Sequence, residues 1–191
     1  PVVPAPAERD ITSAAVSTPI GSASTGLASP AVPSPVVAQA SDLPDLGPAP
    51  AVVSDHWLNV EAPLDWTALD GTVRVVEFWT FGCINCINDI PAVRGWHDAY
   101  GNRDDFRIVS VHYPEFAREH DLDAVAASLE RLHVPYAVAI DNDGVNWRAW
   151  RQRAWPTRYV VDRHGRIRFT HVGEGAYDQT THAIEALLAE R

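Results

Sequence analysis

The sequence predicts an α/β fold, with a central β-sheet and helices on both of its sides, over residues 56–191. In this part, short apolar runs alternate with segments whose apolar residues recur every three or four positions. All seven Trp, five Phe and five Tyr lie at or after Trp57, so the side chains that can build a core are confined to it. Its length suits one domain of ordinary size and not two.

Residues 1–55 differ in composition, being rich in Pro, Ala, Ser and Val and holding ten of the chain's fifteen prolines. A segment without aromatic anchors cannot bury enough apolar surface to offset the entropy of ordering it. We therefore expect a disordered tether, although an unstructured tail would have the same composition. No run in the sequence resembles a signal peptide or spans a bilayer, so we expect membrane contact only through an anchor removed ahead of Pro1.

The charge of the chain argues against one class of partner. The formal net charge is −10, and the fifteen cations are all arginines scattered along the sequence. Nucleic-acid binding requires cations clustered against phosphates, because counterion release supplies most of the affinity. We therefore expect no nucleic-acid partner.

The first half of the domain predicts a strand and a long helix. Residues 57–69 suggest a short strand or hairpin at the edge of the core, closed by a turn at Asp70-Gly71. Residues 73–79 are almost continuously apolar, as in a strand buried on both faces. The helix that follows carries an apolar stripe, and Pro91 is expected to kink it. The stripe consists of Ile84, Ile87, Ile90, Val93, Trp96 and Tyr100.

The second half predicts four more strands and three helices. Residues 106–112 form the next strand, and Asp121 caps a helix whose core face is Leu122, Val125, Leu129 and Leu132. Residues 141–144 have turn chemistry and resemble a calcium loop only superficially, because the ligand spacing fails and no Glu closes it. The remaining elements are a strand at 136–140, a short helix around 147–150, a hairpin of 158–162 with 167–172, and a last helix from about residue 178.

Cys83 and Cys86 are the only cysteines, and they follow the apolar strand at the start of the long helix. A structural disulfide over this four-residue loop would stabilise the fold by only about 2 kcal/mol. A structural zinc site needs further ligands, yet the chain has no other Cys and no two His three to five residues apart. The spacing therefore favours a reactive dithiol.

A dithiol at this position has a direct physical basis. At a helix N-terminus the first sulfur meets unpaired backbone N–H groups and the positive end of the helix dipole, which stabilise a thiolate. The second cysteine lies one turn later and is expected to be buried. Cys83 is thus predicted to be the nucleophile, and Cys86 to resolve the mixed disulfide that Cys83 forms.

Several short motifs carry a family resemblance that covers about residues 57–188. They are Phe78-Trp79-Thr80, Cys83-Ile84-Asn85-Cys86, Val111-His112, Pro114-Glu115-Phe116, Asp141-Asn142, Trp155-Pro156 and Gly173-Glu174-Gly175. With these motifs the chain resembles the thioredoxin superfamily, and within it the TlpA-like branch and the thioredoxin-like domain of DipZ proteins. The resemblance implies a thioredoxin-like fold, with a central mixed β-sheet flanked by helices and an inserted αβ unit.

The resemblance also implies roles for single residues. Pro156 matches the family's cis-proline, which lies against the disulfide, and Trp155 would offer backbone hydrogen bonds to an extended substrate. Glu77 stands where thioredoxins have a buried Asp, so its carboxyl could shuttle the proton of Cys86. A solvated Glu at a strand edge is the alternative. Pro91 matches the kink in the family's active-site helix and is structural.

Three further residues are candidates for contact with a substrate. The loop that carries Glu115 follows a neighbouring parallel strand, so it should open at the same end of the sheet as the cysteines. Glu115 would there tune Cys83 or contact a partner, unless it is an ordinary loop carboxylate. Trp79 and Phe81 are expected to shape an apolar rim around Cys83.

The leading functional hypothesis is a thiol–disulfide oxidoreductase that needs no cofactor and no metal ion. The spacer Ile84-Asn85 contains no His, which favours a reductase over a disulfide oxidase or isomerase. Thr80 to Cys83 has the Thr-x-x-Cys of peroxiredoxins, but Val76 occupies the place of their Pro. A Cu(I) carrier is the alternative of another class, since two thiolates at this spacing suit Cu(I).

The tether and the family resemblance, rather than the cysteines, indicate where such a protein acts. We expect an extracytoplasmic location, periplasmic or at the cell surface, with the domain membrane-tethered or secreted. The implied partners are disulfide-containing exported proteins and a membrane thiol donor of the DipZ type. DipZ proteins also carry a membrane-spanning redox domain and often a further C-terminal module, and we expect neither in this chain.

Overall fold

The computed structural model describes residues 39–190, which form a mixed six-stranded sheet. Across the sheet the order is β1-β4-β3-β2-β5-β6. The three central strands, β4, β3 and β2, run parallel, and β1, β5 and β6 are antiparallel to their neighbours in the sheet. The strands are β1 (Trp57–Leu58), β2 (Val73–Trp79), β3 (Phe106–His112), β4 (Ala137–Ile140), β5 (Thr157–Val161) and β6 (Ile167–Val172).

Strand β2 is the centre of the sheet, and every one of its residues is buried. It pairs in parallel with β3, placing Val76 opposite Val109, and antiparallel with β5, placing Phe78 opposite Thr157. A strand covered on both faces needs apolar side chains on both faces, which explains the run without polar alternation. The bounds of β2 and β3 are those that the sequence predicts.

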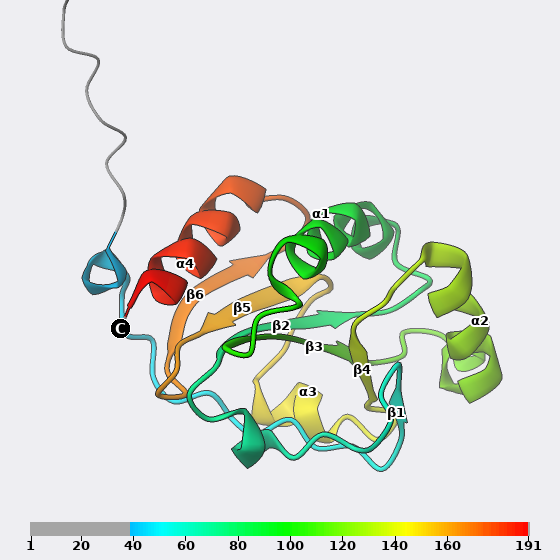
Figure 1. Ribbon diagram of the computed structural model, residues 1–191. Coiled ribbons are helices and arrows are strands. Elements are labelled where there is room, and N and C mark those ends of the chain that lie inside the picture. Colours follow the sequence, from blue (N-terminus) through cyan, green and yellow to red (C-terminus); the bar gives the residue numbers. More distant parts are fainter. Residues whose placement is uncertain (1–38, 191) are drawn as a thin grey trace, which may run out of the picture. The chain divides into compact units, whose positions relative to one another are not determined.

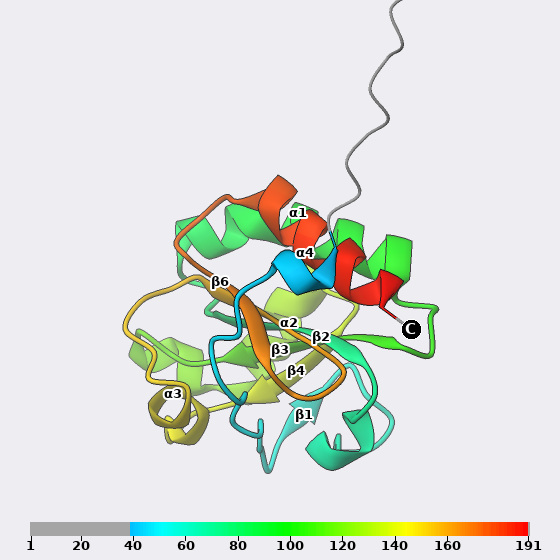
Figure 2. The same cartoon turned by 90° about the vertical axis from the view of Figure 1, so that its left-hand side faces the viewer.

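Helices cover both faces of the sheet, as expected for this fold class. Helices α1 (Ile84–Tyr100), α2 (Leu122–Leu132) and α4 (Tyr177–Ala189) pack on a core with Val75 and Val160, whereas the opposite core holds Val76 and Val161. Consecutive strand residues thus enter opposite cores, which is the period of two that a strand imposes. Figures 1 and 2 show α1 and α4 side by side on one face and the short helix α3 (Val145–Ala149) on the other.

Some local predictions are confirmed and others need correction. Asp121 caps α2, and its carboxylate accepts the amides of Asp123 at 2.9 Å and Ala124 at 3.4 Å. Residues 57–69 form no hairpin, since β1 is followed by a 3₁₀ helix at Trp66–Leu69. The apolar stripe of α1 does not begin at Ile84, which is 66% exposed, because Cys86 is the residue of the first turn that faces the core, at 1% exposed.

The predicted boundary between tether and domain lies too far along the chain. Residues 1–38 lie outside the described part, but residues 39–55 pack onto the domain. Ala40 is 3% exposed and Val52 2%, so each contributes to one of the two cores. Sequence composition misses them because two small apolar side chains in a Pro-rich segment are too few to signal a core.

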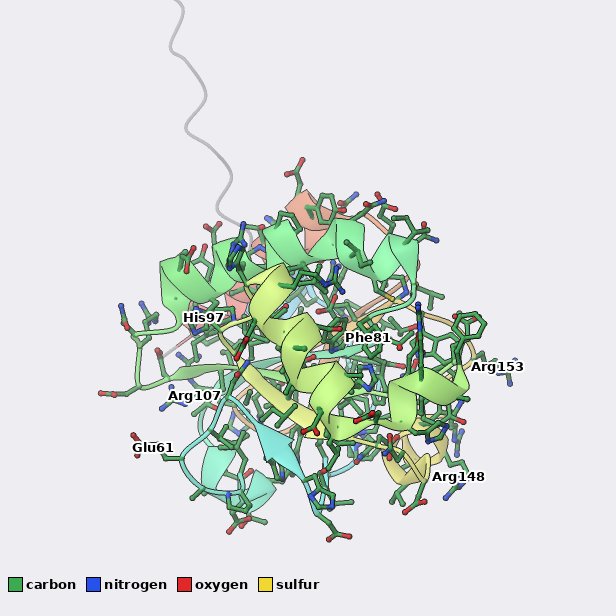
Figure 3. The ribbon with its side chains drawn as sticks, turned by 90° about the vertical axis from the view of Figure 1, so that its right-hand side faces the viewer. Glu61, Phe81, His97, Arg107, Arg148 and Arg153 are labelled. Carbon is green, nitrogen blue, oxygen red and sulfur yellow. The ribbon has the colours of Figure 1, made fainter. Side chains whose placement is uncertain are left out.

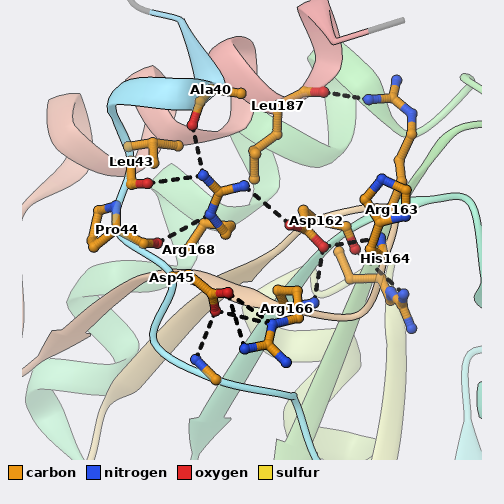
Figure 4. Close-up of polar contacts among 12 residues, drawn as sticks. Ala40, Leu43, Pro44, Asp45, Asp162, Arg163, His164, Arg166, Arg168 and Leu187 are labelled. Atoms are coloured by element: carbon orange, nitrogen blue, oxygen red, sulfur yellow. Dashed lines mark hydrogen bonds and ion pairs between the residues drawn. The ribbon is translucent and has the colours of Figure 1, made fainter.

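Backbone hydrogen bonds hold this segment against β6. The amides of Leu46 and Ala49 donate to the carbonyls of Ile167 and Gly165, each at 2.8 Å. Arg168 donates to the carbonyls of Ala40, Leu43 and Pro44, as Figure 4 shows. An edge strand exposes unpaired backbone groups, and here the segment 40–49 covers those at the start of β6.

Candidate active site

The two cysteines lie where β2 passes into α1, after the loop formed by residues 80–82. Cys83 is the N-cap of α1, and its sulfur accepts the amide of Cys86 at 3.3 Å. Both cysteines are free thiols; Cys83 is partly exposed and Cys86 is 1% exposed. An attacking group from solution therefore reaches the sulfur of Cys83 and not that of Cys86.

The two thiols differ in burial and in the charges and N–H groups around them. Burial raises the pKa of Cys86 well above its usual range, and the hydrogen bond with Cys83 and the charge of Glu77 add to this rise. The sulfur of Cys83 instead lies at the helix N-terminus, where unpaired N–H groups favour negative charge. Cys86 is thus kept as a thiol until a base removes its proton.

Glu77 supplies a carboxyl beneath α1. It is 2% exposed, so the alternative of a solvated strand-edge glutamate is wrong. Burial raises the pKa of Glu77 to about 7, and the nearby Arg158 opposes that rise. At this pKa the carboxyl exchanges a proton readily near neutral pH.

A buried polar network supports the loop that carries Cys83. The Thr80 hydroxyl donates to Oε2 of Glu119 at 2.6 Å and lies 3.3 Å from Nε2 of His112. The hydroxyl has one proton, so Nε2 of His112 carries the proton that points at Thr80. Burial lowers the pKa of His112 to about 4, which keeps its ring neutral.

Glu119 is the residue of this network that sequence reasoning missed. It is fully buried, and its Oε2 also accepts the amides of Glu115 at 2.8 Å and Phe116 at 3.1 Å. Burial opposes its ionisation, but these hydrogen bonds and the one from Thr80 outweigh that effect and lower the pKa of Glu119. No sequence signal ties position 119 to the loop, because the contact joins residues 39 positions apart.

Gly82 allows Glu119 to approach the loop. A Cβ built on Gly82 would overlap Oε1 of Glu119 and lie 3.1 Å from its Cδ. The close approach therefore requires a residue without a side chain directly before Cys83.

The predicted apolar rim of Trp79 and Phe81 needs correction. Trp79 is 2% exposed and Phe81 8%, so neither side chain lines a surface. Both pack on His112, with ring centroids 5.6 Å away in each case, and Phe81 is stacked on the imidazole. Figure 3 shows Phe81 inside the molecule below α1, whereas Arg153 extends from its edge. The two aromatics thus support the loop from beneath.

Trp155 and Pro156 lie at the same end of the sheet as the cysteines, directly before Thr157, which pairs with Phe78. The peptide bond between them is cis. The Trp155 ring is part of an aromatic stack, with centroids 4.5 Å from Trp147 and 5.8 Å from Tyr113. The half-buried ring of Trp155 is thus held by its aromatic neighbours directly before the cis-proline.

Glu115 lies on the expected loop, after β3, but its side chain is exposed. Its backbone amide, rather than its carboxylate, takes part in the network, through the bond to Glu119. The buried carboxylate next to the Cys83 loop therefore comes from Glu119 and not from Glu115.

Exposed apolar side chains flank this end of the sheet. Ile84 follows Cys83 directly, Phe116 follows β3, and Val172 pairs with Thr157 on the strand next to Pro156. They are 66%, 52% and 60% exposed, respectively. Within residues 39–190, no three Asp, Glu, His or Cys side chains gather closely enough to hold a metal ion.

The fold and the dithiol at a helix N-terminus define the class: the chain has a thioredoxin-like fold. No family model matches the sequence. Among solved structures, a thiol–disulfide isomerase from Corynebacterium glutamicum is 23% identical, with a TM-score of 0.65 and coverage of 75% of this chain and 98% of that one. The thioredoxin-like superfamily protein SPOA0173 is 22% identical, with a TM-score of 0.69 and coverage of 75% and 97%.

The sequence is similar to Protein DipZ of Mycobacterium tuberculosis, and the M. bovis protein matches equally well. The two are 36% identical to the chain over 152 residues, which is 78% of this chain and 22% of DipZ. The chain thus spans about a fifth of the length of these relatives. In the described part, no helix has both the length and the apolar character that crossing a bilayer requires.

Proposed function

We propose that the protein is a thiol–disulfide oxidoreductase whose reacting groups are Cys83 and Cys86. The observation that carries this proposal is their unequal placement, with an accessible sulfur at the N-cap of α1 and a buried thiol one turn behind it. The thiolate of Cys83 attacks one sulfur of a substrate disulfide, forming a mixed disulfide and releasing the other substrate sulfur as a thiolate. A nucleophile at the surface is what this first step requires.

The second step uses Cys86 and Glu77. The ionised carboxyl of Glu77 accepts the proton of Cys86, and the new thiolate attacks the sulfur of Cys83. The Cys83–Cys86 disulfide forms, the second substrate thiolate leaves, and two electrons have passed from the protein to the substrate. The carboxyl is suited to this transfer because its pKa of about 7 leaves both protonation states populated near neutral pH.

We assign substrate binding to the surface around Trp155 and Pro156. The exposed apolar side chains of Ile84, Phe116 and Val172 flank the same end of the sheet. An extended segment around a disulfide would lie over Cys83 and pair with the backbone at Trp155. Glu115, exposed on the adjacent loop, would contact charged groups of the substrate.

We further propose that the protein works as a reductase of exported proteins, recharged by a membrane thiol donor of the DipZ type. The similarity to Protein DipZ supports this assignment. So does a likeness in fold to a secreted Mycobacterium tuberculosis disulfide oxidoreductase, at a TM-score of 0.56. The location implied is extracytoplasmic.

Trapping of the mixed disulfide tests the proposal. Cys86→Ser should accumulate a covalent adduct with a disulfide-containing peptide, because Cys83 attacks and nothing resolves the product. Cys83→Ser is the matched control and should form none, since Cys86 is 1% exposed. The chain has no other cysteine, so any adduct is unambiguous by mass spectrometry. No adduct with Cys86→Ser would contradict the proposal, and tight Cu(I) binding without exchange would favour a copper carrier.

A further inference from the structure

A buried arginine lies between the active-site helix and the last helix. Arg158 on β5 is 1% exposed, and its guanidinium lies over the rings of Trp96 on α1, at 4.8 Å, and Tyr177 on α4, at 5.9 Å. A cation this deeply buried needs partners that compensate the loss of water. Its partners include Glu77, the proposed base.

Two carboxyls compete for this one cation. Asp89, fully buried on α1, forms an ion pair with Nη2 of Arg158, while Glu77 lies 3.8 Å from the same nitrogen through its Oε1. Nη1 of Arg158 is already used, because it donates to the carbonyl of Gly175 and the hydroxyl of Thr180, each at 3.2 Å. Nη2 is therefore the nitrogen that the two carboxyls share.

The two carboxyls differ in how well they are satisfied. Oδ1 of Asp89 accepts the hydroxyl of Tyr177 at 2.8 Å and the amide of Gly175 at 3.2 Å, in addition to the ion pair of its Oδ2. Oε1 of Glu77 is buried and accepts no hydrogen bond. One positive charge can balance one negative charge. Because Arg158 pairs with Asp89, Glu77 is the carboxyl left to take up a proton.

We propose that Arg158 and Asp89 are positioning residues that set the protonation of Glu77 and thereby its fitness as the base for Cys86. The inference rests on the proposed function for what the proton transfer achieves. Asp89 raises the proton affinity of Glu77, because it pairs with Arg158 and adds a second negative charge nearby. Arg158 lowers the proton affinity of Glu77, because its positive charge stabilises the ionised carboxyl. The two residues act on Glu77 in opposite directions although they bind each other.

Other groups near Glu77 come from the remaining elements around it. Cys86 faces it from α1 and is held as a neutral thiol, since burial raises its pKa. Tyr136, ahead of β4, is close enough that the charge of Glu77 adds to the effect of burial in raising its pKa. Ser110 on β3 lies opposite Glu77 and carries no charge. Arg158 is thus the cation, and Asp89 the second carboxyl, that act on Glu77.

Carbon-13 NMR of the glutamate carboxyls, with the Glu77 signal assigned through Glu77→Gln, tests the proposal directly. The titration midpoint of Glu77 should fall by one pH unit or more in Asp89→Asn, because Arg158 then serves Glu77 alone. It should rise by one unit or more in Arg158→Met, which removes the cation. If Arg158→Met does not fold, Asp89→Asn still decides the matter.

The control is Asp162→Asn, which removes another buried carboxylate paired with an arginine. Asp162 is 2% exposed, and its Oδ2 lies 3.1 Å from Nη1 of Arg168. This variant therefore also loses a buried ion pair and is expected to be less stable. It should leave the Glu77 midpoint unchanged. An unchanged midpoint in Asp89→Asn, or a shift in the same direction in both test variants, would overturn the proposal.

A second readout separates this inference from the proposed function. The pH profile for resolution of the mixed disulfide should move with the Glu77 midpoint, down in Asp89→Asn. A shifted NMR midpoint with an unmoved pH profile would contradict Glu77 as the base for Cys86, yet it would leave the charge sharing among the three residues in place. A structural role alone would move neither readout.

Discussion

Gly82→Ala tests most directly whether the close contact with Glu119 stabilises the loop that carries Cys83. The new methyl group would overlap Oε1 of Glu119 and lie 3.4 Å from Nη2 of Arg118. Glu119 cannot swing away freely, because its other oxygen holds Thr80 and two backbone amides. Overpacking costs about 1–3 kcal/mol, and the loss of one hydrogen bond to a buried charge costs about 1.5–3 kcal/mol. We therefore expect the free energy of unfolding to fall by about 2.5–6 kcal/mol.

Urea unfolding measures this loss, and the chain offers a matched control. Gly95 lies inside α1, and a Cβ built on it meets no atom within 4 Å. Gly95→Ala should therefore stabilise the protein by about 0.5–1 kcal/mol, as Ala does in a helix interior. A double-mutant cycle with Glu119→Ala should show that Gly82→Ala is nearly neutral once the carboxyl is gone. Additive effects in this cycle, or a loss below about 0.5 kcal/mol for Gly82→Ala, would refute the reasoning.

Four further predictions concern caps, charges and the aromatic stack. Asp121→Ala should cost about 1 kcal/mol in urea unfolding, because it removes the N-cap of α2. The hydrogen bond from Arg103 lowers the pKa of Asp105 to about 2, so Asp105→Asn should destabilise the protein at neutral pH, with the deficit vanishing as pH falls from 3.8 to about 2. Glu77 has a raised pKa, so its ionisation weakens the fold as pH rises from 4.5 to about 7, and Glu77→Gln should gain up to ~3 kcal/mol over wild type at pH 8 but nothing at pH 4. Trp147→Ala removes the ring 4.5 Å from Trp155 and should raise KM for a disulfide peptide several-fold with little change in kcat.

Local signals in the sequence predict most of the fold. Apolar runs at residues 73–79 and 106–112 give strands with those bounds, and Asp121 caps the helix expected after it. These features depend on residues that are a few positions apart in the sequence. Apolar periodicity and capping residues can therefore be recognised directly in the sequence. The order of these elements also predicts a central sheet with flanking helices, and the family resemblance implies that the sheet is mixed.

The polar network around the site is not predictable in this way. Glu119 contacts Thr80 across 39 positions, and Arg158 contacts Asp89 across 69. Such contacts arise only when distant strands and helices pack, and a single sequence shows the charged residues without their partners. For the same reason, the sequence predicts that Trp79 and Phe81 form a rim around Cys83, whereas the structure buries both against His112. The identity of an aromatic residue near a reactive cysteine does not show which way its ring points.

The N-terminal boundary illustrates another limit. Composition assigns residues 39–55 to a tether, yet Arg168 and the edge of β6 hold this segment through its backbone carbonyls and amides. Backbone hydrogen bonds do not depend on side-chain type, so composition does not register them.

The equilibrium reduction potential of the Cys83–Cys86 pair tests the central claim most directly. It is measured by equilibrating the protein with dithiothreitol or glutathione buffers and counting free thiols by mass after alkylation. The account predicts one reversible two-electron transition near the thioredoxin value of about −270 mV. A transition near about −120 mV, roughly 7 kcal/mol away, would contradict the reductase assignment. The absence of any reversible disulfide would contradict the redox function itself.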